Sequence, residues 1–427
     1  MFSTLANAWK IPELRKKLIF TLLILLIYRF CSVIPVPFVS GVELQGFYNA
    51  VLSQTVLGLY NAMSGSAFSM ASVLALGIQP YINASIIIQL LTVAIPALER
   101  MAKDEGEEGK KKIERITRYT TVGLGLLLGF GYYQLISSQT NPVTGNAILT
   151  QSGIMPELVI ILAFTAGSCF VMWMGEQITE FGIGNGISMI LFANIISGLP
   201  GGINTMTGIK WWINVIVIVA MALLVIFIVF INDAERRIPI QYAKRVVGRK
   251  VYGGQNTNLP IKVSMSGVMP VIFAQSICSI PATICAFIPG GTNGWWYNNI
   301  FSPRCWPYFA FYVLMIFFFS WFYSTIQYDP VEISNNLKKN GGFIPGFRPG
   351  KPTSDFIKKV IGKIVIFGAV YLAVAAGLPI AAGNALTDVQ NLAIGGTSVI
   401  IVVGVALETV QSLEAQMLMR HYKGFLD

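Results

Sequence analysis

Ten apolar runs recur along this chain of 427 residues, and most are long enough to cross a bilayer as a helix. A transmembrane helix needs roughly 17 to 25 apolar residues. Only 12% of the residues are charged, far below the quarter or so that is usual in soluble domains. The pattern predicts an all-α polytopic membrane protein with ten transmembrane helices. The runs cover residues 18–34, 67–98, 119–136, 158–174, 187–199, 211–231, 264–288, 308–326, 360–378 and 398–410.

The second run is longer than one span and too short for two, and Gly77-Ile78-Gln79-Pro80 interrupts it. Proline removes a backbone donor and clashes with the preceding helical turn. Non-helical backbone at membrane depth is tolerated only where it is buried in protein or lines a cavity. We therefore expect a half-helix followed by a full span, with a simple proline kink as the alternative.

The basic residues divide very unevenly between the two sides of the membrane. If the N-terminus is cytoplasmic, 27 of the 30 Lys and Arg residues lie on the cytoplasmic side, and only Lys210 and Arg304 lie opposite. Basic residues accumulate on the cytoplasmic side of membranes. Both termini are therefore predicted to be cytoplasmic. The remaining Arg29 lies near the end of the first run, where it can snorkel or pair with a carbonyl.

The spans divide five and five around residues 200–210. An odd number of spans in each half makes the second half enter the membrane in the opposite sense, as in inverted repeats with a site near the midplane. The expected units are an N-terminal half, residues 1–200, and a C-terminal half, residues 201–427, with cytoplasmic loops at 232–263 and 327–359. The short loop at 200–210 would act as a hinge only through its Gly201-Gly202 backbone.

The sequence offers no catalytic or metal-binding pattern. His421 is the only histidine, and HExxH and GxSxG are absent. We predict a protein that is not an enzyme and needs no metal or cofactor. Ionisable residues inside spans usually mark ion or proton pathways, and they are scarce here. A secondary transporter stays the alternative, because transporters share inverted repeats and broken helices.

The two large cytoplasmic loops carry clusters of basic side chains. Alternating apolar residues in loop 232–263 predict a ribbon that stands off the membrane. Two projecting basic loops on one face suit a large acidic partner, including RNA phosphate. Topogenic charge or attraction to anionic lipid is the alternative. The candidate partner-binding residues are Arg237, Lys244, Arg245, Arg249, Lys338, Lys339 and Arg348.

Six motifs in order resemble the SecY family of bacterial protein-conducting channels over essentially the whole chain. They lie at residues 75–91, 175–188, 242–245, 336–339, 348–350 and 395–398. The resemblance implies two inverted five-helix halves around an hourglass pore in the bacterial cytoplasmic (inner) membrane. Such a channel passes unfolded secretory polypeptides and releases membrane segments sideways through a lateral gate. It also implies the small membrane subunits SecE and SecG, and delivery of substrate with its signal sequence by the SecA ATPase or a ribosome.

The resemblance also assigns roles to residues of this sequence. A narrow apolar collar can block ions by dewetting, yet part around a passing chain. The implied pore ring is Ile78, Ile82, Ile187, Leu191, Ile272 and Ile401, and the implied lateral-gate residues are Asn83, Gln89 and Ser276.

The implied plug is a half-helix at about residues 57–72. Its small residues, Gly58, Ser64, Gly65 and Ser69, would let it seat loosely. Ser264 departs from the family, in which Asn is expected, and this puts in doubt a polar contact at the cytoplasmic end of the gate.

Overall fold

The chain folds into long helices that follow the apolar runs. The structure, a computed structural model, describes residues 7–53, 55–103, 106–206, 210–242, 245–247, 250–252, 256–264, 267–288, 294–303, 305–385 and 390–423. Within them, ten helices overlap the ten predicted spans: α2 (Pro12–Cys31), α5 (Gln79–Ala94), α7 (Gly106–Ser137), α8 (Ile154–Phe181), α9 (Gly186–Met206), α10 (Trp211–Asp233), α11 (Met269–Phe287), α12 (Trp306–Gln327), α14 (Lys351–Ala385) and α15 (Gln390–Lys423).

Five of these helices, α8, α10, α12, α14 and α15, are each long and apolar enough to cross a membrane. Helix α5 meets the same test only together with α6 (Pro96–Lys103), from which it is bent by 105°. Helices α9 and α11 contain shorter apolar stretches.

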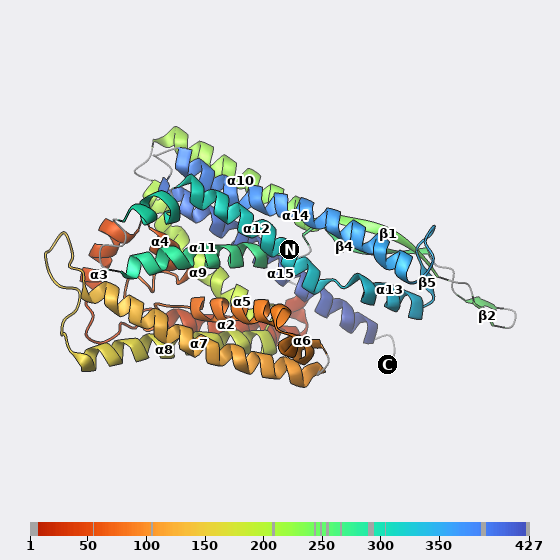
Figure 1. Ribbon diagram of the computed structural model, residues 1–427, viewed down its shortest axis with the longest axis horizontal. Helices are drawn as coiled ribbons and strands as arrows, with labels where there is room; N and C mark the ends of the chain where they lie inside the picture. Colours follow the sequence, from red (N-terminus) through yellow and green to blue (C-terminus); the bar gives the residue numbers. More distant parts are fainter. Residues whose placement is uncertain are drawn as a thin grey trace.

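The helices form two groups that face each other across the molecule (Figure 1). In one group α7 packs on α5 and α8, and α2 packs on α8. In the other, α14 packs on α12 and α15, and α10 packs on α15. The groups meet where α11 contacts α5 and α7, and where α15 contacts α9. This arrangement places α5, α9, α11 and α15 around a common centre, where side chains from all four helices share one buried cluster. The exact boundary between the two halves stays a prediction.

A small β-structure stands at one end of the helices (Figure 1). Strands β1 (Glu235–Tyr242), β4 (Asn256–Lys262) and β5 (Gly342–Phe343) form a sheet in the order β4-β1-β5, and β2 (Arg245–Val247) pairs with β3 (Lys250–Tyr252). Alternate residues Ile238 and Ile240 of β1 are buried against α13 (Pro330–Lys339) and α14. The predicted ribbon in loop 232–263 is therefore confirmed: it is an antiparallel pair of strands in a largely helical chain.

The half-helix predicted within residues 67–98 is wrong. A helix, α4 (Val56–Met63), lies earlier, after α3 (Gly41–Phe47), and residues 64–78 form turns. Gly65, Ser66 and Ala71 have positive φ angles of 64°, 71° and 48°, which a right-handed helix cannot contain. Pro80 lies in the first turn of α5, where its missing N–H has no helical partner to lose. It therefore begins a helix and does not kink one.

The loop predicted at residues 200–210 is also largely wrong, because α9 continues through Pro200 to Met206. Proline is tolerated in membrane helices where neighbouring groups satisfy the freed backbone carbonyl. The predicted Gly201-Gly202 hinge therefore lies inside a helix.

Candidate functional site

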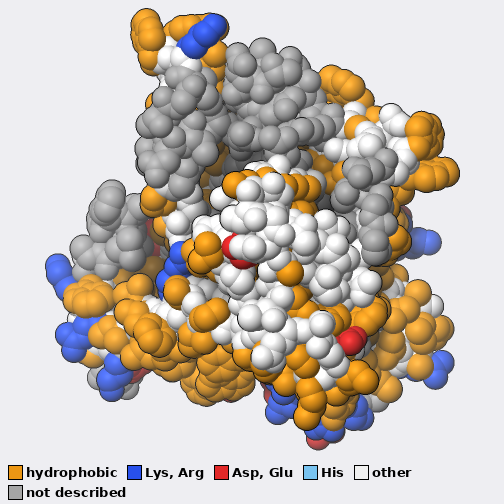
Figure 2. All heavy atoms as spheres, turned by 90° about the vertical axis from the view of Figure 1, so that its left-hand side faces the viewer, with side chains coloured by type: hydrophobic (Ala, Val, Ile, Leu, Met, Phe, Trp, Pro, Cys, Tyr) orange, Lys and Arg blue, Asp and Glu red, His pale blue; other side chains and the backbone are white. Residues whose placement is uncertain are grey.

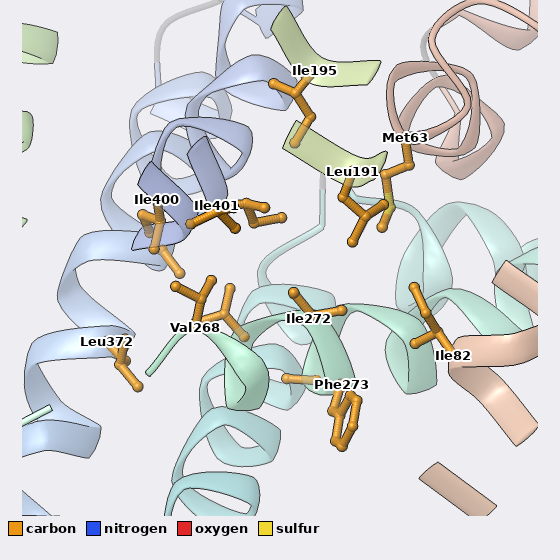
Figure 3. Close-up of a cluster of buried hydrophobic side chains, with 14 of the residues drawn as sticks. Met63, Ile82, Leu191, Ile195, Val268, Ile272, Phe273, Leu372, Ile400 and Ile401 are labelled. Carbon is orange, nitrogen blue, oxygen red and sulfur yellow. The ribbon is translucent and has the colours of Figure 1, made fainter. Parts of the chain in front are cut away.

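The six aliphatic residues predicted as a pore ring lie in one buried cluster. Ile78, Ile82, Leu191, Ile272 and Ile401 are each no more than 2% exposed, and the partly buried Ile187 packs against them. In Figure 3, Ile82, Leu191, Ile272 and Ile401 point toward one another from four different helices. We call these six residues the collar.

Helix periodicity explains why two helices supply two members each. Ile78 caps the start of α5, and Ile82 follows it by four residues. Ile187 and Leu191 stand in the same relation at the start of α9. Residues four apart lie on one face of a helix, so each pair presents a continuous aliphatic strip. The collar therefore draws on α5 and α9 from one helix group and on α11 and α15 from the other.

The end of α4 fills the space beside the collar. Met63, its last residue, belongs to the same buried cluster and lies next to Leu191 (Figure 3). Helix α4 contacts α9, α11 and α15, and so touches both helix groups. A segment that occupies the centre of a helical ring obstructs any path through it.

The predicted plug residues lie in this segment, but they do not seat it loosely. Ser64 Oγ accepts a hydrogen bond from Phe68 N at 3.1 Å, and Ser69 Oγ donates to Ser66 O at 3.0 Å. The helix ends at Met63, so only the first part of the predicted half-helix at 57–72 is helical. Small side chains serve tight turns and internal hydrogen bonds here, and both serines are buried.

The two plug glycines permit close approaches of the chain. A side chain at Gly58 would lie 2.4 Å from the Ser53 carbonyl oxygen. Gly65 has a positive φ and lies beside Arg29, whose Nη1 donates to the Gly65 carbonyl at 2.7 Å. Pairing with a carbonyl was one of the two expectations for Arg29, and it is confirmed.

Three buried amides around Met63 were missed from the sequence. Gln79 Nε2 lies 2.9 Å from Met63 Sδ and Gln275 Nε2 lies 3.7 Å from it, while Asn194 Nδ2 donates to the Met63 carbonyl at 2.7 Å. All three are at most 5% exposed, and each amide oxygen lacks a hydrogen-bond partner in the described part of the chain. Amides inside apolar runs were the available signal, because such groups are expensive to bury without a purpose.

The predicted gate residues lie on helices that contact each other, Asn83 and Gln89 on α5 and Ser276 on α11. Asn83 Oδ1 and Ser276 Oγ are buried without a partner among the described residues. Gln89 makes a contact that the sequence did not reveal: its Oε1 accepts a hydrogen bond of 2.9 Å from the hydroxyl of Tyr323 on α12. A polar bond therefore joins α5 to α12 across the seam between the helix groups.

Four of the basic residues predicted to bind partners belong to β1, β2 and α13, elements at the end of the molecule that carries the strands (Figure 1): Arg237, Arg245, Lys338 and Lys339. Lys338, Lys339 and Arg348 are exposed. Arg237 is also exposed, but its Nε is paired with Glu235 Oε1 at 2.6 Å. Arg245 lies in β2, whereas Lys244 and Arg249 fall outside the described residues.

The opposite end of the molecule is different in character. In the view of that end, hydrophobic and uncharged atoms dominate the described surface, with a few acidic side chains and with Lys and Arg side chains at the margins (Figure 2). Among the described residues, no group of three or more His, Cys, Asp or Glu side chains could hold a metal ion.

Two facing helix groups with a buried collar and an obstructing segment between them define a class of helical membrane-protein fold that known structures share. One, described as the structure of a protein conducting channel, aligns with a TM-score of 0.65 at 16% identity, over 94% of this chain and 92% of its own. Another, Sec61 in the canine ribosome-channel complex from the endoplasmic reticulum, aligns with a TM-score of 0.60 at 15% identity and the same coverage.

Comparison with related sequences identifies the family to which the chain belongs. Residues 72–410 match the SecY family profile. The chain is 42% identical to the protein translocase subunit SecY of Streptomyces galbus over the full length of both, and 42% identical to that of Thermotoga maritima over 98% of the latter. The chain belongs to the SecY family.

Proposed function

We propose that this protein is the central pore-forming subunit of a protein translocase, which passes unfolded secretory polypeptides across a membrane. The observation that carries the proposal is the collar, six aliphatic side chains from both helix groups with the end of α4 beside them. Such a ring excludes ions by dewetting and offers a passing backbone no hydrogen-bonding group to hold it. The passing polypeptide would move between the helices that contribute the collar residues.

The gate is proposed to open between α5 and the pair α11 and α12. Parting there would carry a hydrophobic segment from the pore to lipid, and a signal sequence would use the same opening. Support comes from buried polar atoms at this seam, Asn83 Oδ1 and Ser276 Oγ, which lack partners in the described chain. A seam with unsatisfied polar groups is less stable than an apolar one, and so is easier to part.

The location that we propose is the bacterial cytoplasmic membrane, with both termini in the cytoplasm. The distribution of 27 against two basic residues supports this orientation. The curated relatives compared above come from bacteria.

The channel is proposed to be passive, with the driving force supplied by partners. These are the SecA ATPase or a ribosome at the strand-bearing end, and the small membrane subunits SecE and SecG against the helices. The exposed Lys338, Lys339 and Arg348 support docking at that end, since basic side chains suit acidic protein or RNA phosphate.

Reconstitution tests this function directly. The purified chain, with SecE in lipid vesicles and SecA and ATP outside, should protect an unfolded precursor protein from added protease. Vesicles with the chain but without ATP are the control. If precursor stays fully digestible with all components present and the chain correctly inserted, the channel function is wrong. Uptake of a small solute with an ion gradient, in place of precursor, would favour a transporter.

A further inference from the structure

Two hydrogen bonds attach the end of α4 and the turn after it to α9 and α2, and a third joins Asn194 of α9 to Tyr28 of α2. Asn194 Nδ2, on α9, donates to the Met63 carbonyl at 2.7 Å and lies 2.8 Å from the Tyr28 hydroxyl. Arg29 Nη1, on α2, donates to the Gly65 carbonyl at 2.7 Å. The bonds to Met63 and Gly65 reach the backbone of the plug segment, whereas Gln79 and Gln275 approach the Met63 side chain.

The Met63 carbonyl is one that the helix itself cannot satisfy. The last four carbonyls of a helix have no intrahelical donor, and Met63 is the last residue of α4. Asn194 and Met63 are 1% and 5% exposed, so water does not readily replace the lost donor. Asn194 therefore caps α4 from a neighbouring helix, and breaking this cap leaves a buried carbonyl unsatisfied.

The polar groups close tightly around Gly65. A Cβ there would lie 2.8 Å from Arg29 Nη1, 2.9 Å from Asn194 Oδ1 and 3.1 Å from Ser197 Oγ. The residue also has a φ of 64°, which glycine adopts at little cost. The chain therefore leaves α4 by a turn that packs closely against side chains of α2 and α9.

A second attachment lies further along the segment and has a different setting. Tyr132, on α7, donates its hydroxyl proton to the Phe68 carbonyl at 2.6 Å, and the two rings are 4.6 Å apart. Phe68 belongs to a separate buried cluster between α7 and α8. The segment is thus anchored at Phe68 by ring packing and one hydrogen bond, and at Met63 and Gly65 by hydrogen bonds from α9 and α2, with the Met63 side chain packed in the collar cluster.

We propose that Tyr28, Arg29 and Asn194 form a latch that holds the end of α4 beside the collar, and that breaking this latch frees the plug. The inference rests on the proposed function, because a plug matters only in a channel. Hydrogen bonds suit the release of the plug because they weaken steeply once donor and acceptor move apart. The freed donors and acceptors can then be hydrated in an opened pore.

Amide hydrogen exchange of the full chain in lipid nanodiscs tests the latch without an activity assay. Asn194→Leu removes both contacts of the amide at similar volume, and Arg29→Met removes the donor to Gly65. Each should speed exchange across residues 60–72 about tenfold, because an unsatisfied buried carbonyl favours the released state by that order. Tyr28→Phe, which spares the bond to Met63, should have a smaller effect.

Two matched controls separate the latch from general loosening. Arg15→Met removes an exposed arginine from the same helix, α2, and Thr165→Val removes a buried hydroxyl that donates only within α8. Neither should change exchange at residues 60–72. Single-channel recordings should show raised resting ion conductance for Asn194→Leu and Arg29→Met, and wild-type conductance for both controls.

Wild-type exchange at residues 60–72 in both latch variants would overturn the proposal. If Asn194→Leu fails to insert, the exposed Arg29→Met still decides the question. Wild-type protein is tested for precursor translocation in parallel. Failure of translocation contradicts the channel function, while translocation with unchanged exchange in the variants contradicts the latch alone.

Discussion

At the scale of single residues, the collar makes the most direct prediction. Replacing Ile82 and Ile187 together by Ser puts hydroxyls where a dry aliphatic ring excludes ions, so ion leak through resting channels should rise. Val at the same two positions keeps the ring apolar and should leak little more than wild type. Potassium efflux from loaded proteoliposomes measures both. Equal efflux from the Ser and Val variants, with both correctly inserted, would remove these residues from the barrier.

Arg348 makes a second prediction at this scale. It is exposed between Gly346 and Gly350, whose φ angles are 86° and 105°, so a tight turn presents one guanidinium outward. Its planar fork pairs with a carboxylate or phosphate in two hydrogen bonds, which Lys cannot do. We expect Arg348→Lys to lose much of the translocation and Arg348→Glu nearly all, with thermal stability within about 0.5 kcal/mol of wild type. Lys351→Glu, in the same region, controls for charge alone. Wild-type transport and partner binding by Arg348→Glu would make this loop merely topogenic.

At the scale of elements, the bond between Tyr323 and Gln89 joins α12 to α5. Tyr323→Phe removes the bond and keeps the ring that packs 5.2 Å from Phe273. Losing a hydrogen bond of about 0.5–1.5 kcal/mol should shift the seam several-fold toward opening. The variant should therefore accept precursors with weaker signal sequences. Tyr312→Phe, on the same helix, removes a buried hydroxyl without a partner in the described chain and serves as the control. An unchanged signal-sequence threshold in Tyr323→Phe would show that this bond does not restrain the gate.

A second pair of elements, α3 and the loop after α7, is joined through Glu43. Its carboxylate accepts hydrogen bonds from Thr144, Asn146 and Asn141, and these lower its pKa below the ordinary 4.5. Because the pKa of Glu43 is lower in the folded than in the unfolded chain, its carboxylate stabilises the fold above pH 4.5. This stabilisation is lost as the pH falls through the pKa of the folded protein. Glu43→Gln should therefore lower the Tm slightly at pH 7, and the difference from wild type should shrink toward pH 3. A difference that is the same at both pH values would contradict this linkage.

At the scale of the whole molecule, the orientation in the membrane can be tested by labelling. Cysteines placed at Lys111 or Arg348 should resist a membrane-impermeant maleimide added to intact cells, whereas one at Val143, 80% exposed at the other end, should react. The parent chain, with its own five cysteines, sets the background. Reversed labelling would overturn the predicted topology.

Local properties of the chain were sufficient to predict the helices and the ribbon in loop 232–263, whereas the collar was implied by the resemblance to the SecY family. Hydrophobicity and helical periodicity depend only on residues close together in the sequence, so they can be recognised without knowledge of the tertiary structure. The same reasoning failed at residues 64–78, because the turns there depend on positive φ angles at Ser66 and Ala71. Such angles are energetically unfavourable for residues other than glycine, and contacts with the surrounding structure offset that cost.

The tertiary structure alone decided which polar groups meet. Asn194 follows Tyr28 by 166 residues and Tyr323 follows Gln89 by 234, and each of these side chains lies in an apolar run with nothing nearby in sequence to name its partner. Hydrogen bonds require donor and acceptor within about 3 Å, a condition set by how helices pack and not by composition. The sequence by itself therefore determined a ten-span apolar chain with a strong charge asymmetry, while packing determined which polar groups hold the end of α4 and join α5 to α12.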